Sequence, residues 1–325
     1  MRYVGFALQW LMKALAVVLA ITVLNFLIVR LAPGDPAIVM AGEAGAADSQ
    51  FLAQVRKDFG LDRPIYVQLA TYVGKVLTLD LGRSYRTRRP VGDMLLERLP
   101  ATLLLTGTAY IFALIVGALL GAIAAAKAHT FLDSVLTAVA LVFYATPIFW
   151  VGLLLILVFS VQLGWLPPFG MHSLIPVKGT LWQMLDTLKH LVLPALTLGL
   201  FYVAVYVRLT RASMLDTASL EYVKTARAKG LPEWRVLTAH ILRTALIPII
   251  TFAGMQAGNL VGGAIVVETV FAWPGIGRLA FDALFQRDYN ILLGVFLISA
   301  LMVVFFNMLT DLAVRVADPR VGSRT

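Results

Sequence analysis

Six long apolar runs alternate with polar segments along the 325-residue chain. They cover roughly residues 11–31, 101–126, 134–162, 190–208, 245–270 and 291–314. An α-helix needs about 20 mostly apolar residues to cross ~30 Å of hydrocarbon, and each run is close to this length or exceeds it. A hydrophobic fraction of 60% with only 14% charged residues lies outside the range of soluble domains. We therefore expect an all-α, polytopic membrane protein with six transmembrane helices.

The polar segments divide the chain into parts. Residues 1–31 hold the N-terminus and the first helix, whose apolar run is too long for a cleaved signal peptide. Residues 32–100 form a long insertion, expected to be external, in which the apolar spacing over 50–77 predicts short amphipathic helices on the membrane surface. Residues 101–314 hold the other five helices, and 315–325 form a short tail.

The net charge of +9 is distributed unevenly. If the N-terminus is cytoplasmic, the cytoplasmic segments contain most of the Lys and Arg outside the insertion: Arg2, Lys13, Lys127, Arg208, Arg211, Lys224, Arg227, Lys229, Arg235, Arg243, Arg315, Arg320 and Arg324. The two short outer loops contain only Lys178, Lys189, Arg278 and Arg287. This positive-inside pattern predicts an N-in, C-in orientation, and it explains the basicity without a nucleic-acid partner.

The sequence lacks the residues that several kinds of catalysis and ligand binding require. The chain has no cysteine, no GxSxG, no HExxH and no P-loop, so we expect no catalytic residue, no metal site and no nucleotide bound by this chain. The central parts of the six runs carry no formal charge, which disfavours an ion-coupled carrier. Arg30 and Glu268 lie near the ends of runs and are expected to extend to the membrane interface. Energy for uphill transport would have to come from another polypeptide.

Small residues recur within two of the runs. Gly254, Gly258 and Gly262 share one helical face, and Gly117 and Gly121 share another. Such faces let neighbouring backbones approach closely, so we expect helix packing sites, with a moving interface between helix bundles as the alternative. Beside the first face lie two polar residues, Gln256 and Asn259. They could line a transport pathway or form hydrogen bonds between helices, and the sequence does not decide between these roles.

A polar segment at residues 217–240 separates the fourth run from the fifth. The spacing over 217–229 predicts a helix, Gly230 suits a left-handed helix end with Leu231 as its apolar contact, and Pro232 suits the first turn of a second helix. The segment therefore predicts two short helices that meet at a sharp corner, which we call the elbow. A rigid elbow favours a surface that another protein binds. The alternative is a solvated basic loop that serves only topology.

The elbow also carries a family resemblance. YVKTARAKG (222–230), followed by His240 and RTALIP (243–248), resembles the cytoplasmic signature of type I ABC importer permeases of the dipeptide, oligopeptide and nickel systems. Further stretches agree in order and spacing: RLAPGDP (30–36), GLDRPIYVQ (60–68), LDLGRSY (79–85), TPIFWVGLLL (146–155), ETVFAWPGIGRLAFDALFQRDY (268–289) and NMLTDLAVRVADPRVG (307–322). The resemblance covers nearly the whole chain and is to the B-type permease, the subunit with the long first external segment.

The resemblance implies the type I ABC importer permease fold and a set of partners. These are a second homologous permease, two cytoplasmic ABC ATPase subunits that bind ATP and Mg, and an external substrate-binding protein. The elbow would couple the permease to an ATPase through Tyr222, Lys224, Thr225, Ala226, Arg227, Ala228, Lys229 and Gly230. The chain departs from the general signature where Lys224-Thr225-Ala226 replaces Glu-Ala-Ala and Arg243 replaces Pro. Thr244 also stands where the subfamily usually has Asn.

The expected function is that of a non-catalytic permease subunit in the cytoplasmic (inner) membrane of a prokaryote. It would form half of the pathway of an ATP-driven importer. Peptides are the leading substrate class by resemblance, with nickel chelates and glutathione-like compounds as alternatives. Two other functions stay open: a stand-alone secondary carrier or channel, and a non-transporting membrane scaffold whose elbow recruits a cytoplasmic partner.

Overall fold

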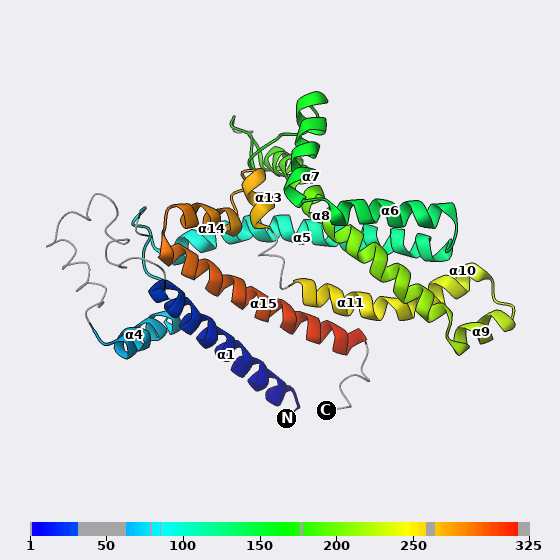
Figure 1. The fold of residues 1–325 in the computed structure, drawn as a ribbon, viewed down its shortest axis with the longest axis horizontal. Coiled ribbons are helices and arrows are strands. Elements are labelled where there is room, and N and C mark those ends of the chain that lie inside the picture. The colour runs from blue at the N-terminus through cyan, green and yellow to red at the C-terminus, as the bar shows by residue number, and fades with distance from the viewer. Residues whose placement is uncertain are drawn as a thin grey trace. The chain divides into compact units, whose positions relative to one another are not determined.

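The structure is a computed structural model that describes residues 2–31, 63–78, 80–84, 86–175, 178–257 and 264–317 (Figure 1). Within these ranges every regular element is helical, and the only strand-like pairing is an isolated bridge between Arg83 and Pro90. The expected all-α class is thus confirmed for the described part of the chain. Two compact units are present, Met1–Pro100 with Gly275–Val304, and Ala101–Pro274 with Phe305–Thr325.

The first unit contains α1 (Arg2–Leu31), α4 (Ile65–Leu77), the start of α5 (Val91–Ala126), α14 (Ile276–Phe285) and the first half of α15 (Tyr289–Ala317). Its core consists of apolar side chains from α5, α14 and α15: Val91, Leu95, Ile276, Leu279, Ala280, Ala283, Ile291 and Val295. Two hydrogen bonds fix the loop before α5 to the start of α15. Ser84 donates to the Asp288 carboxylate at 2.6 Å, and the Asn290 amide donates to the Arg83 carbonyl at 2.8 Å.

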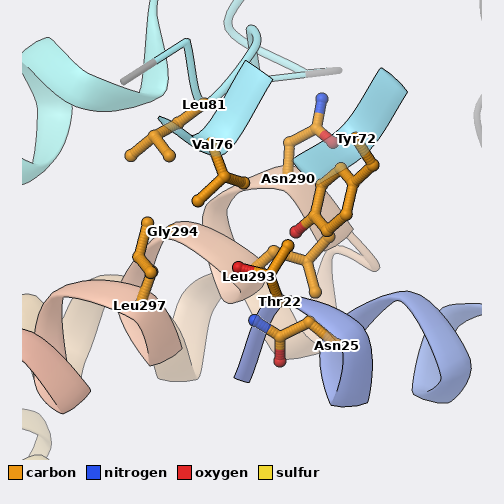
Figure 2. Close-up of a pocket in the computed structure, with 9 residues that line it drawn as sticks. All are labelled: Thr22, Asn25, Tyr72, Val76, Leu81, Asn290, Leu293, Gly294 and Leu297. Atoms are coloured by element: carbon orange, nitrogen blue, oxygen red, sulfur yellow. The ribbon is translucent and has the colours of Figure 1, made fainter. Parts of the chain in front are cut away.

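A small cavity lies between α1, α4 and α15 in this unit. Figure 2 shows its lining of Thr22, Asn25, Tyr72, Val76, Leu81, Asn290, Leu293, Gly294 and Leu297. The free volume is about 20 Å³, which is room for one or two water molecules. The cavity is therefore too small to hold a transported solute.

The second unit is built around α8 (Thr180–Ala218). This helix packs against α6 (Phe131–Ala145), α7 (Ile148–Leu155), α11 (Arg243–Ala257) and α13 (Ile265–Val270), and it buries Leu193, Leu198 and Tyr206 (Figure 1). A π-helical turn, Ile156–Gln162, follows α7. The elbow helices α9 (Glu221–Ala228) and α10 (Glu233–Arg235) and a π-helical segment, Val236–Leu242, lead into α11. The most apolar window of α8 is 72% buried, the highest share among the candidate spans.

Four helices are long and apolar enough to cross a membrane within the described residues: Val91–Ala126, Thr180–Ala218, Glu233–Gln256 and Tyr289–Thr310. The run expected as one helix over 134–162 is instead two helices, α6 and α7, bent by 104° at Thr146-Pro147. Proline disfavours a helical conformation in the residue before it, and Thr146 is extended, with ψ of 134°. If this bent pair counts as one span there are five, and the total of six stays a prediction.

The other runs also differ in extent from the helices. α5 and α8 begin at Val91 and Thr180, before the apolar runs at 101 and 190, because polar turns extend both helices. Within the range expected as a span over 245–270, α11 ends at Ala257 and α13 begins at Ile265, with residues 258–263 outside the described part. Of the insertion at 32–100, the described residues contain α4 and the start of α5.

Candidate functional site

The corner of the elbow has the geometry that its sequence predicts. Gly230 adopts φ of +74°, and its N–H donates to the Arg227 carbonyl at 2.9 Å. The N–H of Leu231 donates to the Ala226 carbonyl at 3.4 Å. These two bonds form a Schellman motif, which ends α9 and satisfies carbonyls that the helix leaves unpaired. Pro232 lies one position earlier than expected, as the N-cap of α10 rather than within its first turn.

The elbow is anchored by a small apolar core. Val223 and Ala226 of α9 are buried, 0% and 5% exposed, against Met214 of α8 and against Val236, Ile241 and Ala245. Leu231 packs on the same cluster, as expected for the apolar contact that follows a Schellman turn. Because α9 shares one core with the end of α8 and with the π-helical segment and α11 that follow the corner, the elbow is a folded element rather than a solvated loop.

Two polar contacts link α9 to the segment that follows the corner. The Tyr222 hydroxyl contacts the Thr244 hydroxyl at 2.9 Å and the His240 carbonyl at 3.2 Å. Across the corner, Arg227 binds both carboxylate oxygens of Glu233, at 2.7 and 3.2 Å. This hydrogen bonding raises the pKa of Arg227 above its ordinary value. Tyr222 and Arg227 thus hold α9 from both ends.

The structure divides the eight predicted coupling residues by role. Ala226 is buried and belongs to the core, whereas Tyr222 and Arg227 use their polar ends for contacts within the elbow. The other five are exposed on the outer surface of the elbow: Lys224, Thr225, Ala228, Lys229 and Gly230. Together they leave a basic, largely small-residue surface available to a partner.

Sequence reasoning missed one residue of this surface. Trp234 is 68% exposed in the first turn of α10, next to the corner. A large aromatic side chain that stays exposed among charged residues is typical of binding surfaces, where Trp often contributes much of the affinity. The signal was present in the sequence, since Trp234 lies between Glu233 and Arg235 and outside every apolar run.

The other predicted site residues give a partial picture. Gln256 is half-buried near the end of α11, and Asn259 lies outside the described residues, so their roles remain predictions.

The small-residue faces lie at close contacts between helices. A β-carbon at Gly121 would lie 2.6 Å from the Val207 carbonyl of α8, and Gly117 is equally tight against Tyr206. Gly254 packs against Thr310 of α15, while Gly258 and Gly262 lie outside the described residues.

The expectation that Glu268 extends to the membrane interface is wrong. Its side chain is 0% exposed in α13, and the Thr102 hydroxyl of α5 donates to its carboxylate at 2.7 Å. The indole N–H of the nearby buried Trp273 donates to the Ala101 carbonyl at 2.8 Å. A buried carboxylate requires such hydrogen bonds, and Thr102 is 166 residues away in sequence.

Comparisons with known proteins agree on one family. The profile described as "Binding-protein-dependent transport system inner membrane component" matches residues 117–323, and the profile of the N-terminal part of such membrane components matches residues 3–106. Together the two profiles cover most of the chain, including the elbow.

Relatives match over nearly their full length. The di/tripeptide transport system permease protein DppB of Pseudomonas aeruginosa is 42% identical, with 93% of this chain and 94% of the relative covered. The dipeptide transport system permease protein DppB of Escherichia coli K12 is 39% identical, with 97% and 98% covered. Among solved structures, the MetNI methionine ABC transporter in an inward-facing conformation has a TM-score of 0.57 at 16% identity, covering 69% of this chain and 96% of that chain. This last likeness shows the fold.

Proposed function

Because the chain belongs to the family of binding-protein-dependent transport system inner membrane components, we propose that it is the permease subunit of an ATP-driven peptide importer. The printed functions of the two DppB relatives support peptides as the substrate class. The observation that carries the proposal is the elbow, a folded two-helix element with an exposed basic surface and an exposed tryptophan. A stand-alone channel or carrier has no evident use for such an element.

The full assembly that we propose follows from this role. A second homologous permease completes the pathway, two cytoplasmic ATPase subunits bind ATP and Mg, and an external binding protein delivers the solute. The chain lies in the inner membrane with both termini in the cytoplasm. Gln256 and Asn259 are proposed to line the pathway between the two permeases, and no catalytic residue or cofactor is assigned to this chain.

The contacts of the elbow suggest how it transmits movement. An ATPase binds the exposed surface around Lys224, Lys229 and Trp234. When ATP binding closes the ATPase pair, the bound ATPase displaces α9. Because Tyr222 and the Arg227–Glu233 pair fasten α9 to the helix that continues as α11, this displacement moves α11 as well as the end of α8. Rocking of the two helix bundles then exposes the pathway alternately to each side of the membrane.

The Gly230→Val variant tests this coupling. A β-branched residue at φ of +74° costs roughly 1–2 kcal/mol and misplaces the corner. We expect the variant to insert into the membrane and to assemble, but to lose ATP-driven uptake of dipeptides in vesicles that contain the whole transporter. Gly164→Val is the matched control. Gly164 also has a left-handed φ, +65°, with open space around it, but it lies outside the elbow, so uptake should persist.

Unchanged uptake by Gly230→Val would remove the elbow from the mechanism. Co-purification separates the proposal from its two alternatives. An importer subunit should bring down a second permease and P-loop ATPases. A scaffold would bring down a partner without supporting uptake, and a secondary carrier would transport in vesicles that contain this chain alone.

A further inference from the structure

The side chain of Arg208 in α8 makes a contact that the sequence does not predict. The sequence places this residue among the basic groups at the cytoplasmic end of the fourth apolar run. In the structure its guanidinium lies over the ring of Tyr144 of α6, 4.2 Å from the ring centre. That ring stacks on Phe201, with centroids 5.6 Å apart and planes 16° apart. Phe201 precedes Arg208 by two turns, so the arginine side chain extends back along α8 toward the N-terminal end of that helix.

The depth of this guanidinium is set by α6. The helix begins at Phe131, directly after a polar turn at 127–130, and its first turn carries Asp133, which binds Arg211. The backbone of Tyr144 lies at the other end of α6, about 16 Å further along the helix axis by the standard rise per residue, and its ring extends to a guanidinium whose own backbone lies one turn of α8 before Arg211. The side chain of Arg208 therefore points away from the nearer polar surface and toward the middle of the bundle. A cation whose Nε is buried without a hydrogen-bond partner is costly and marks a candidate functional site.

The contrast with Arg211 shows what Arg208 lacks. Arg211 binds both oxygens of the Asp133 carboxylate, at 2.6 and 2.8 Å. Arg208 has no carboxylate partner among the residues that the structure describes, and its Nε is buried without a hydrogen-bond partner. Its ring contact with Tyr144 covers one face of the guanidinium, while Tyr144 itself is 43% exposed. The positive charge is thus held in place but not neutralised.

We infer that Arg208, with Tyr144 and Phe201, binds the C-terminal carboxylate of a peptide in transit. The inference rests on the proposed peptide-importer function and names a contact within its pathway. A guanidinium offers a planar fork of donors that matches a carboxylate. The stacked rings of Tyr144 and Phe201 provide an apolar platform beside it for the side chain of the peptide. An anionic lipid offers similar chemistry, but its phosphate lies at the membrane surface, whereas this guanidinium points back along α8, away from the basic end of the helix.

The test compares uptake with ATP hydrolysis in the whole transporter. Vesicles carrying wild type, Arg208→Gln or Arg208→Lys receive a radiolabelled dipeptide bound to the external binding protein. We expect Arg208→Gln to lower uptake by about tenfold or more, the effect of losing a charge-assisted hydrogen bond, while ATP hydrolysis stimulated by the loaded binding protein continues. Arg208→Lys should give intermediate uptake, because it keeps the charge but not the fork. Lys189→Gln, which removes an exposed cation from the same helix, should not change uptake.

Several results would overturn the inference. These are uptake by Arg208→Gln within twofold of wild type, parallel loss of uptake and ATP hydrolysis, and Arg208→Lys uptake no better than that of Arg208→Gln. The lipid alternative is separated by repeating the assay in vesicles of phosphatidylcholine alone. A defect that appears only with anionic lipid present assigns the site to lipid. Failure of the wild-type transporter to import any dipeptide would refute the proposed function itself, and this inference with it.

A photoreactive residue at position 144 gives a second, independent measurement. During turnover it should cross-link to the labelled dipeptide, and the cross-link should weaken in the Arg208→Gln background. Cross-linking to the second permease in place of the dipeptide would assign Arg208 to an interface between subunits and overturn the inference.

Discussion

At the elbow corner, Gly230 adopts φ of +74° and has nothing within 4 Å of the place where a β-carbon would lie. At the crossing of α5 with α8, Gly121 is helical, yet a β-carbon there would lie 2.6 Å from the Val207 carbonyl. The first position requires glycine for its backbone conformation and the second for its lack of volume. Only the first requirement is set by neighbours in the sequence.

The ion pairs of the two regions differ in the same way. Arg227 and Glu233 are six residues apart, on either side of the corner, and their side chains are 43% and 56% exposed. Asp133 and Arg211 are 78 residues apart, and the Asp133 side chain is 5% exposed. The ion pair of the elbow is therefore specified by local sequence, and its exposure to solvent makes it weak. The helix bundle is specified by distant partners and stabilised by buried contacts, where errors are costly.

The largest expected effect comes from breaking the buried pair. Asp133→Ala leaves Arg211 without its partner and should lower the free energy of unfolding by about 3 kcal/mol. Thermal unfolding of the purified chain in detergent measures the change. The double variant Asp133→Leu, Arg211→Leu removes both charges and should recover most of the lost stability. If the single variant is as stable as wild type, the pair does not support the bundle.

A second variant tests the crossing of α5 with α8. Gly121→Ala forces a methyl group against the backbone of α8 and should cost about 1–3 kcal/mol. Gly107→Ala, in the same helix, is the control. No atom lies within 4 Å of its β-carbon position, so the change should be neutral or stabilising by up to about 1 kcal/mol, the helix preference for alanine. Equal effects of the two substitutions in the same unfolding assay would contradict a close approach at Gly121.

The smallest effect on stability is expected at the elbow. Glu233→Gln removes the exposed pair with Arg227 and should change the free energy of unfolding by less than about 1 kcal/mol. Glu221→Gln, which removes the exposed contact with Lys224, provides a matched comparison. If the corner pair stiffens the elbow, Glu233→Gln lowers dipeptide uptake per ATP hydrolysed while Glu221→Gln does not. Equal uptake by the two variants would show that the pair is dispensable for coupling.

The features that depend on near neighbours or on composition could be predicted from the amino-acid sequence alone. The apolar runs gave the helical membrane class, because a span must satisfy its own backbone. Gly230, Leu231 and Pro232 gave the corner, because a helix end depends on a few adjacent residues. Pro147 also carried the signal for the bend between α6 and α7, but the prediction treated residues 134–162 as one continuous span.

Features that depend on a distant partner are set by the packing of the helices. In the folded chain, α8 packs against Gly117 and Gly121. Glu268 is buried against Thr102, and the side chain of Arg208 lies over the ring of Tyr144. A sequence shows which polar or charged side chains require a partner in the folded protein, but it does not show which residue that partner is. The burial of a charge depends on contacts made by residues far apart along the chain, and those contacts exist only once the helices have packed.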